Sequence, residues 1–332
     1  MTAATDIPTT RSGRFNSRNV SKIAIRLGAF VAFAGIFLYF ALTARGFLSP
    51  YNLTNVIEQS TILGLLAFGI TVVFIGTGTD VQKGGIDLSV AANAGLCAAV
   101  YAVLMRDGYG NGVAIPAALG TGMFIGFLNG LAVVTLRIIP LLGTLAVMNI
   151  AAGLELTLTE NTVVPVQSPL MNTLAFGRFL GISVLAWCFL VTTLILVWVV
   201  QFSQIGLRLY AVGGHHEAAK AAGINTGRYI YGAYLFAGLM AGATSILIVS
   251  RLSSSTPGTG LILLPILAAA LLGTVFSRRF IPTIGGTFLA ALFIGILANG
   301  FQLLGISSYW VAGVQGALIL LVVAVTSFAK KN

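Results

Sequence analysis

Apolar runs long enough to cross a membrane recur along almost the whole chain. A helix needs about 20 mostly apolar residues to span the hydrocarbon core. Ten spans are expected, at residues 24–44, 57–77, 87–105, 114–136, 139–158, 181–203, 229–250, 262–276, 283–303 and 309–328. Only 8% of the 332 residues are charged, whereas soluble domains carry about a quarter. The sequence therefore predicts an all-α, polytopic integral membrane protein.

The first and eighth spans show how the ends and the middle of the chain are organised. The run from residue 23 to 44 is too long for the apolar part of a signal peptide, so a retained helix is expected there. Residues 1–22 then form a basic cytoplasmic tail, 23–329 the membrane domain, and 330–332 a cytoplasmic C-terminus. The eighth span is short and contains Pro265, which is typical of broken helices that line a transport cavity.

The basic residues indicate an orientation. Of the 18 Lys and Arg residues, only Arg45, Arg106, Arg178 and Arg251 fall outside when the N-terminus is placed inside. Lys and Arg concentrate in cytoplasmic loops of membrane proteins. Both termini are therefore expected in the cytoplasm. The net charge of +10 reflects this topology and does not indicate a nucleic-acid partner.

A short pattern occurs twice. Ile115-Pro116, Gly120-Thr121 and Asn129-Gly130 are echoed by Ile281-Pro282, Gly286-Thr287 and Asn299-Gly300. The copies lie in the fourth and ninth expected spans, and an odd shift of five spans inverts the second copy across the membrane. Inverted repeats are typical of transporters, with the solute handled between them. Chance similarity between Gly-rich apolar helices is the alternative.

The stretch of residues 205–228 concentrates charged, imidazole and glycine residues in a cytoplasmic position. Gly213-Gly214 is expected to break the preceding segment, and a short helix is expected over about residues 215–222. Gly223 supplies the flexible stop found at helix C-termini. Such a helix fits either a docking element for a soluble partner or an amphipathic connector on the membrane surface.

The charged residues of this short helix suit its dipole, because Glu217 lies toward the N-terminus and Lys220 toward the C-terminus. The adjacent His215 and His216 suggest a metal site only at first sight. Adjacent side chains diverge on a helix, and a zinc site needs further ligands that are not close in sequence. No metal site is therefore predicted.

Several polar residues fall within the spans or at their edges. Asp87 and Ser89 open the third span, where they could cap the helix or form an inner gate, since ionisable groups at membrane depth tend to be functional. The candidates for a solute path are Asn93, Asn129, Thr144, Asn149, Asn299 and Gln302. Hydrogen bonding between helices is the alternative role for these residues.

An ordered set of strings carries a family resemblance. It consists of Gly85-Ile86-Asp87-Leu88-Ser89-Val90, Gly213-Gly214 before Glu217-Ala218-Ala219, Ala222-Gly223-Ile224-Asn225, Arg251-Leu252-Ser253-Ser254 and Leu304-Gly305-Ile306-Ser307-Ser308-Tyr309. Together these strings resemble the ribose-type branch of ATP-binding cassette (ABC) importer permeases, over roughly residues 45–328. The Glu217-Ala218-Ala219 string resembles the coupling-loop motif of such permeases.

The resemblance implies a division of labour in a bacterial inner membrane. A periplasmic binding protein would deliver a monosaccharide or related polyol, and two permease subunits, identical or different, would form the path in contact with membrane lipid. A cytoplasmic ATPase would hold ATP and Mg, and the chain has no phosphate-binding loop of its own. The chain would then be no enzyme, and its ATPase-coupling residues would be Arg208, Gly213, Gly214, His215, His216, Glu217, Ala218, Ala219, Lys220 and Gly223.

Departures from the branch cluster at the ends of spans. Ile262 and Leu264 stand where acidic residues are usual, and residues 277–282 replace a glycine-rich loop. A different hypothesis is a secondary transporter of a small polar solute driven by an ion gradient. It requires acidic residues within the membrane, and only Glu58 and Glu155 lie in suitable positions.

Overall fold

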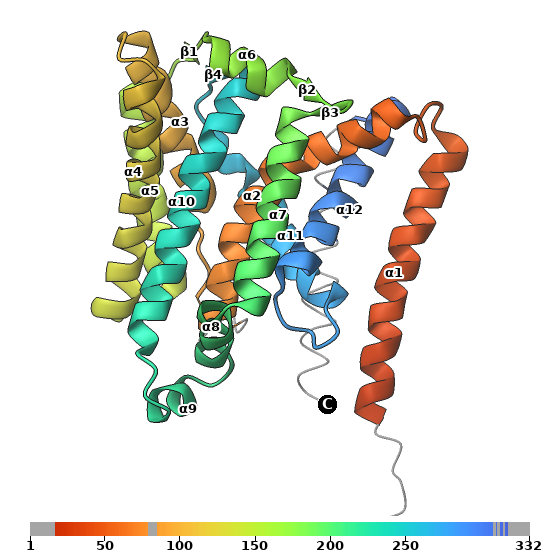
Figure 1. Ribbon diagram of the computed structural model, residues 1–332, viewed down its shortest axis with the longest axis vertical. Coiled ribbons are helices and arrows are strands. Elements are labelled where there is room, and N and C mark those ends of the chain that lie inside the picture. The colour runs from red at the N-terminus through yellow and green to blue at the C-terminus, as the bar shows by residue number, and fades with distance from the viewer. Residues whose placement is uncertain (1–16, 79–84, 308–309, 311–312, 315, 318–332) are drawn as a thin grey trace, which may run out of the picture.

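The structure is a computed structural model that describes residues 17–78, 85–307, 310, 313–314 and 316–317. Figure 1 shows the helices arranged as a bundle. The helices are α1 (Ser17–Thr43), α2 (Pro50–Thr77), α3 (Val90–Arg106), α4 (Asn111–Gly130), α5 (Pro140–Thr159), α6 (Pro169–Phe176), α7 (Val184–Phe202), α8 (Gln204–Gly214), α9 (His216–Ala221), α10 (Thr226–Leu252), α11 (Leu263–Phe276) and α12 (Ile284–Leu303). One π-helical turn, Leu131–Thr135, extends α4, and one 3₁₀ turn, Thr259–Ile262, precedes α11.

Nine expected spans coincide with helices, and seven helices of the described residues are long and apolar enough to cross a membrane. The tenth expected span, 309–328, lies almost entirely outside the described residues, as do residues 1–16 and the C-terminal residues 330–332. The largest boundary differences are in α1, which begins at Ser17 within the expected tail and not at residue 24, and in α2, which begins at Pro50 and not at residue 57. Ser49 caps this helix by accepting a hydrogen bond from the Asn52 amide (3.2 Å), and the first two turns include the polar residues Asn52, Thr54 and Asn55.

Two pairs of short strands close one end of the bundle, which we call the β1 end. β1 (Val164–Pro165) pairs antiparallel with β4 (Ser254–Ser255), and β2 (Arg178–Phe179) pairs with β3 (Ile182–Ser183). Together with α6 they lie at the top of Figure 1, opposite the end formed by α8 and α9, which we call the α9 end. The residues between α5 and α7 are thus folded onto the bundle. The fold remains all-α, as predicted.

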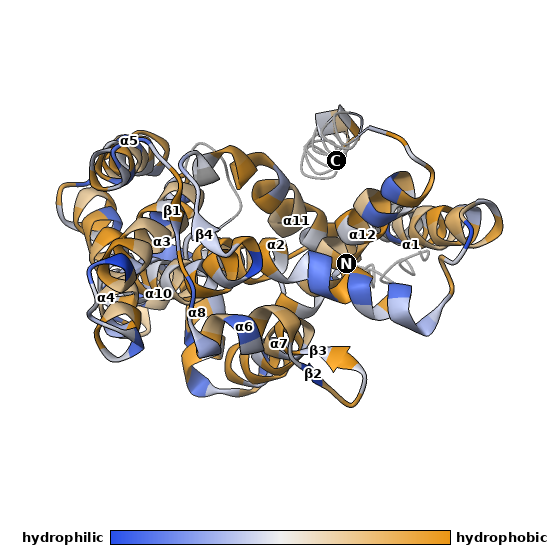
Figure 2. Cartoon of the chain, turned by 90° about the horizontal axis from the view of Figure 1, so that it is seen from above, coloured by the Kyte–Doolittle hydropathy of each residue, from blue (hydrophilic) through white to orange (hydrophobic). Residues whose placement is uncertain are grey.

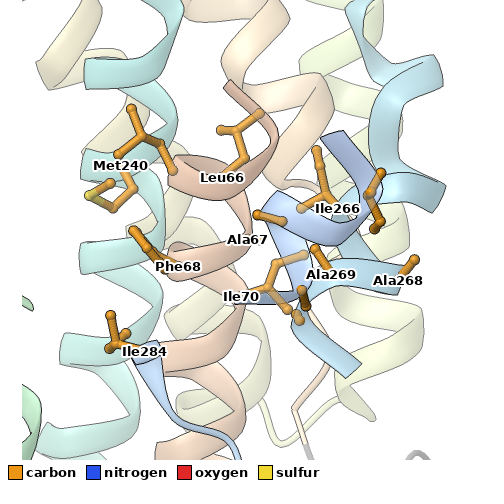
Figure 3. Close-up of a cluster of buried hydrophobic side chains, with 14 of the residues drawn as sticks. Leu66, Ala67, Phe68, Ile70, Met240, Ile266, Ala268, Ala269 and Ile284 are labelled. Atoms are coloured by element: carbon orange, nitrogen blue, oxygen red, sulfur yellow. The ribbon is translucent and has the colours of Figure 1, made fainter. Parts of the chain in front are cut away.

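The core forms around α2 and α10. Buried Leu66, Phe68 and Ile70 of α2 lie between residues of α10 and α11, including Met240 and Ile266 (Figure 3). Apolar residues predominate on the helices in Figure 2, including outward faces that lipid would cover. The apolar runs are thus mostly buried in α2 and α10 and largely exposed in α1 and α5.

Glycines allow α4 and α10 to cross closely. A Cβ atom at Gly122 would overlap the Gly238 carbonyl oxygen, and a Cβ atom at Gly238 would overlap the Gly122 carbonyl oxygen. Small residues at helix crossings let backbones approach in membrane proteins. The expected repeat therefore includes a helix whose glycines are used for packing.

The two expected repeat copies lie in α4 and α12, which run in opposite directions in Figure 1. The contacts follow the same relation: α10 packs against α3 and α4, whereas α2 packs against α11 and α12. The paired helices α3 and α11 are also alike, since the apolar helical stretches Val90–Arg106 and Gly260–Phe276 are both shorter than the other spans. This arrangement is that of an inverted repeat.

Candidate functional site

A non-helical segment, Gly85–Ser89, leads into α3 from the α9 end of the bundle. Backbone groups of a non-helical segment at membrane depth cannot use water, so other parts of the protein must satisfy them. Thr144 of α5 does so twice: its Oγ1 accepts from the Leu88 amide (3.2 Å) and lies 3.0 Å from the Ile86 carbonyl oxygen. Thr77 Oγ1, at the end of α2, lies 3.2 Å from the Gly85 carbonyl oxygen.

Asp87 and Ser89 are buried and joined to α4. Asp87 Oδ1 accepts from the Ser89 amide (2.8 Å) and from Ser89 Oγ (2.7 Å). Asn129 Nδ2 lies within hydrogen-bond distance of both Ser89 Oγ (2.7 Å) and Asp87 Oδ1 (3.2 Å). Ser89 occupies the N-cap position of α3, but its side chain makes no capping hydrogen bond. Asp87 therefore satisfies the Ser89 amide at the start of α3, whereas the cap expected of Ser89 itself is not formed; the gate role stays a prediction.

Tyr234 of α10 completes the enclosure of the segment. Its hydroxyl lies over Gly85, where a Cβ atom would come within 2.6 Å of the phenolic oxygen. Neither this hydroxyl nor Asn129 Oδ1 has a hydrogen-bond partner among the described residues, although both are buried. The segment thus has contacts to α2, α4, α5 and α10, with two polar atoms left for a further group.

The other expected path residues are dispersed. Asn93 Nδ2 donates to the Gly122 carbonyl oxygen (3.1 Å), which joins α3 to α4. Asn299 exchanges two hydrogen bonds of 3.0 Å with Asn52 of α2. Asn149 and Gln302 are exposed on this chain. Buried Asn93, Asn129 and Asn299 therefore make the interhelical contacts that were the alternative.

The expected short helix is present as α9, His216–Ala221, at the α9 end of the bundle in Figure 1. Gly223 ends it with a φ of 81°, and the Ile224 amide donates back to the Ala219 carbonyl oxygen (3.0 Å). Glu217 and Lys220 are exposed on it, in the first and last turns. The sequence-based prediction of this helix is confirmed.

The two histidines diverge as expected. His215 Nδ1 accepts from the Ala218 amide (3.2 Å) and so caps α9. His216 Nε2 lies 3.2 Å from Thr226 Oγ1, at the start of α10. Among the residues that the structure describes, no group of three or more His, Cys, Asp and Glu side chains could hold a metal ion. Each imidazole therefore has a structural contact of its own.

The sequence did not predict α8 as a helix, yet α8 connects α9 to the bundle. Gly213 and Gly214 belong to this helix, which ends only at His215. A Cβ atom at Gly213 would overlap the Ile75 carbonyl oxygen near the end of α2. Tyr210 donates its hydroxyl hydrogen to the Pro282 carbonyl oxygen (2.9 Å), just before α12. Burial raises the pKa of Tyr210 to about 12, so this hydroxyl stays protonated and can donate.

The contacts of α8 and α9 thus reach three helices. α8 touches the end of α2 and the segment before α12, and α9 reaches the start of α10 through His216. A displacement of α9 would be transmitted to the ends of two central core helices and one repeat helix.

The comparisons with known proteins agree with this geometry. Residues 52–323 match the family described as branched-chain amino acid transport system / permease component. The ribose import permease protein RbsC of Bacillus subtilis (strain 168) is 34% identical over 301 residues, covering 90% of this chain and 91% of the relative. The chain belongs to this family of ABC transporter permeases. The resemblance to ribose-type permeases is thereby confirmed.

Other sugar permeases are also similar to this chain. RbsC of Escherichia coli (strain K12) is 33% identical and covers 84% of this chain and 86% of its own length. An L-arabinose ABC transporter permease of Azospirillum brasilense is 27% identical and covers 92% and 89%. A solved structure described as a metal-chelate type ABC transporter, in an inward-facing conformation, gives a TM-score of 0.51 at 14% identity and covers 91% of this chain and 99% of that chain. That likeness supports the fold alone.

Proposed function

We propose that this permease is a subunit of an ATP-driven importer that conducts a monosaccharide or related polyol across a bacterial inner membrane. The connection from α9 through α8 to α2, α10 and α12 supports the proposal most directly. A cytoplasmic ATPase with bound ATP and Mg would push on α9, and a periplasmic binding protein would deliver the solute to the β1 end. Both chain termini and α9 would lie in the cytoplasm, as the distribution of Lys and Arg favours.

The proposed inner gate is the Gly85–Ser89 segment. It follows α2 in the chain, and α2 is the helix on which α8 rests, so a movement of α8 would reach the gate. Ser89, Asn129 and Asp87 offer hydrogen-bonding groups suited to a hydroxylated solute. The unpaired Tyr234 hydroxyl and Asn129 Oδ1 are further groups that an opened gate would present.

A second permease subunit would cover the exposed face of α5. Asn149 lies halfway along this 20-residue helix and is exposed between Leu145 and Ile150. Asn149 Nδ2 donates to the Leu145 carbonyl oxygen (2.8 Å), but hydrocarbon offers no partner to the rest of the amide, so its exposure to lipid at that depth is unfavourable. A path lined with water between two permeases would accommodate it. The composition of the purified complex would show whether the second permease is another copy of this chain or a different chain.

The test of the importer proposal is to measure uptake with the two energy sources separated. Depleting ATP should abolish uptake in cells, whereas collapsing the ion gradient at constant ATP should leave it intact. Purification from the native membrane should recover an ATPase subunit with the permease. If uptake instead persists without ATP and collapses with the ion gradient, the ion-coupled secondary transporter becomes the correct description.

Glu217 provides a narrower test of coupling. The substitution Glu217→Lys reverses the charge in the first turn of α9, which faces the proposed ATPase, and places it unfavourably against the helix dipole. We expect ATP hydrolysis to become independent of solute and uptake to fall at least about tenfold, equivalent to about 1.4 kcal/mol of lost coupling. The control is Glu160→Lys, an exposed glutamate beyond α5. Normal coupled uptake by the Glu217 variant would remove this residue from the mechanism.

A further inference from the structure

An apolar groove lies on the flank of the bundle where α7, α8 and α10 meet. Its volume is about 340 Å³, and its lining includes Val72, Leu196, Val200, Leu209, Ala233 and Phe236. The exposed apolar residues Trp198 and Phe202 lie on α7 beside it, and exposed Ile205 of α8 lines it. A groove with this composition faces hydrocarbon and not water, so its natural occupant is an alkyl chain.

The groove continues into a polar pocket of about 660 Å³ toward the α9 end. Arg228 and Tyr229 line both cavities, and Arg208 lines the polar one together with Gly223, Ile224 and Asn225. Arg208 and Arg228 are exposed, and within the described part of the chain the one ion pair is Arg106 with Asp107. Two guanidinium groups without an acidic partner thus stand at the open end of an apolar groove.

We propose that this combined cavity binds one anionic phospholipid. An acyl chain would occupy the α7–α8–α10 groove, and the phosphate would interact with Arg208 and Arg228, since arginine matches phosphate oxygens well. The position suits this ligand, because α7 ends and α10 begins at the same end of the bundle (Figure 1). On the orientation given under the proposed function, that end lies at the inner leaflet, where anionic headgroups attract basic residues.

Bound lipid would contact the helix that connects α9 to the bundle. The groove includes Gly206 and Leu209 of α8, the helix that joins α9 to the bundle. An acyl chain there would pack between α8 and α10 and stabilise one relative position of these helices. The lipid is therefore expected to act on coupling and not on recognition of the solute.

Lipid retention by the complete transporter complex tests the proposal. The delipidated complex would be titrated separately with phosphatidylglycerol and phosphatidylcholine of matched chains, and bound lipid counted by native mass spectrometry. We expect one phosphatidylglycerol per permease chain, with phosphatidylcholine held more weakly. Inorganic phosphate should not displace the phosphatidylglycerol, whereas displacement would identify a site for free anions and overturn the proposal.

Two substitutions separate the headgroup from the chain. Arg228→Gln should weaken phosphatidylglycerol binding about fivefold, the effect of one basic residue near an anionic headgroup, and leave phosphatidylcholine unchanged. Gly232→Leu should weaken both lipids, because Gly232 lines the groove and a Cβ atom there would meet no atom within 4 Å. Filling this open space should leave the fold intact, which a melting curve would check.

The matched control is Arg279→Gln, which removes an exposed arginine that lies outside both cavities. It should bind both lipids as the unaltered complex does. Unchanged phosphatidylglycerol binding in both the Arg228 and the Gly232 variants would overturn the proposal. So would retention by the isolated permease but not by the complete complex, because the ATPase would then occupy the groove. Neither result would affect the ATP-dependence test of the importer.

Discussion

At the scale of single residues, the buried polar side chains stabilise the permease by giving non-helical backbone the hydrogen-bond partners that water would otherwise supply. Thr144 contacts both Ile86 and Leu88 from another helix, and its hydroxyl is fully buried. The sequence identified Thr144 as polar and intramembrane, and it therefore became a candidate for the path. The sequence did not indicate that Thr144 contacts the segment before α3, because that contact exists only after the helices assemble.

We expect Thr144→Val to destabilise the permease by about 1–3 kcal/mol. The change keeps the shape of the side chain but leaves the Leu88 amide without its acceptor in a buried place. Thermal unfolding in detergent would measure the loss. Thr157→Val on the same helix is the control, because the Thr157 hydroxyl is exposed and bonds only to the Gly153 carbonyl oxygen. Equal stability of the two variants would contradict the assigned role of Thr144.

At the scale of elements, the nine spans were predictable because length and apolar character alone distinguish a membrane helix. α8 was missed for a physical reason: its sequence mixes arginine, tyrosine and glycines, and its glycines suggest a break. They serve instead for close packing, since Gly213 fits against the Ile75 carbonyl oxygen. α6 was also not predicted, because Pro165 and Pro169 suggest a loop; Pro169 instead begins a helix and Ser168 caps it.

The two glycines of α8 give a direct test of this packing. Gly213→Ala should lower the thermal stability of the permease and loosen α8 from α2, because the added Cβ atom overlaps the Ile75 carbonyl oxygen. Gly214→Ala should be neutral or stabilise by up to about 1 kcal/mol, since nothing lies within 4 Å and alanine favours helices. Melting curves of the pair would measure the difference. Matching curves would show that α8 does not rest on α2 through Gly213.

At the scale of the whole molecule, the inverted repeat was visible as a few matching residues. The structure extends the match to neighbouring helices, because the apolar helical stretches Val90–Arg106 and Gly260–Phe276 are both shorter than the other spans and occupy corresponding places beside α10 and α2. A sequence pattern of this length could identify only α4 and α12. The correspondence between the other helices of the two copies is visible only from their packing partners, because their sequences have diverged.

The orientation of the whole molecule can be tested by labelling single cysteines. Lys220→Cys and Glu160→Cys would be introduced separately after Cys97 and Cys188 are replaced by alanine; both target positions are exposed. A thiol reagent that cannot cross membranes should label position 160 in spheroplasts and position 220 only after permeabilisation. The reverse pattern would place α9 outside and invalidate the cytoplasmic location of the coupling helix.

The Gly85–Ser89 segment also has a consequence for how the chain is made. Its Leu88 amide finds its acceptor in Thr144, 56 residues later in the chain, and Tyr234 of α10 covers Gly85 later still. When α2 and α3 leave the ribosome, the connection between them has no complete set of partners. The packing of the α2–α3 connection within the bilayer therefore stays incomplete until α10 has been synthesised and inserted.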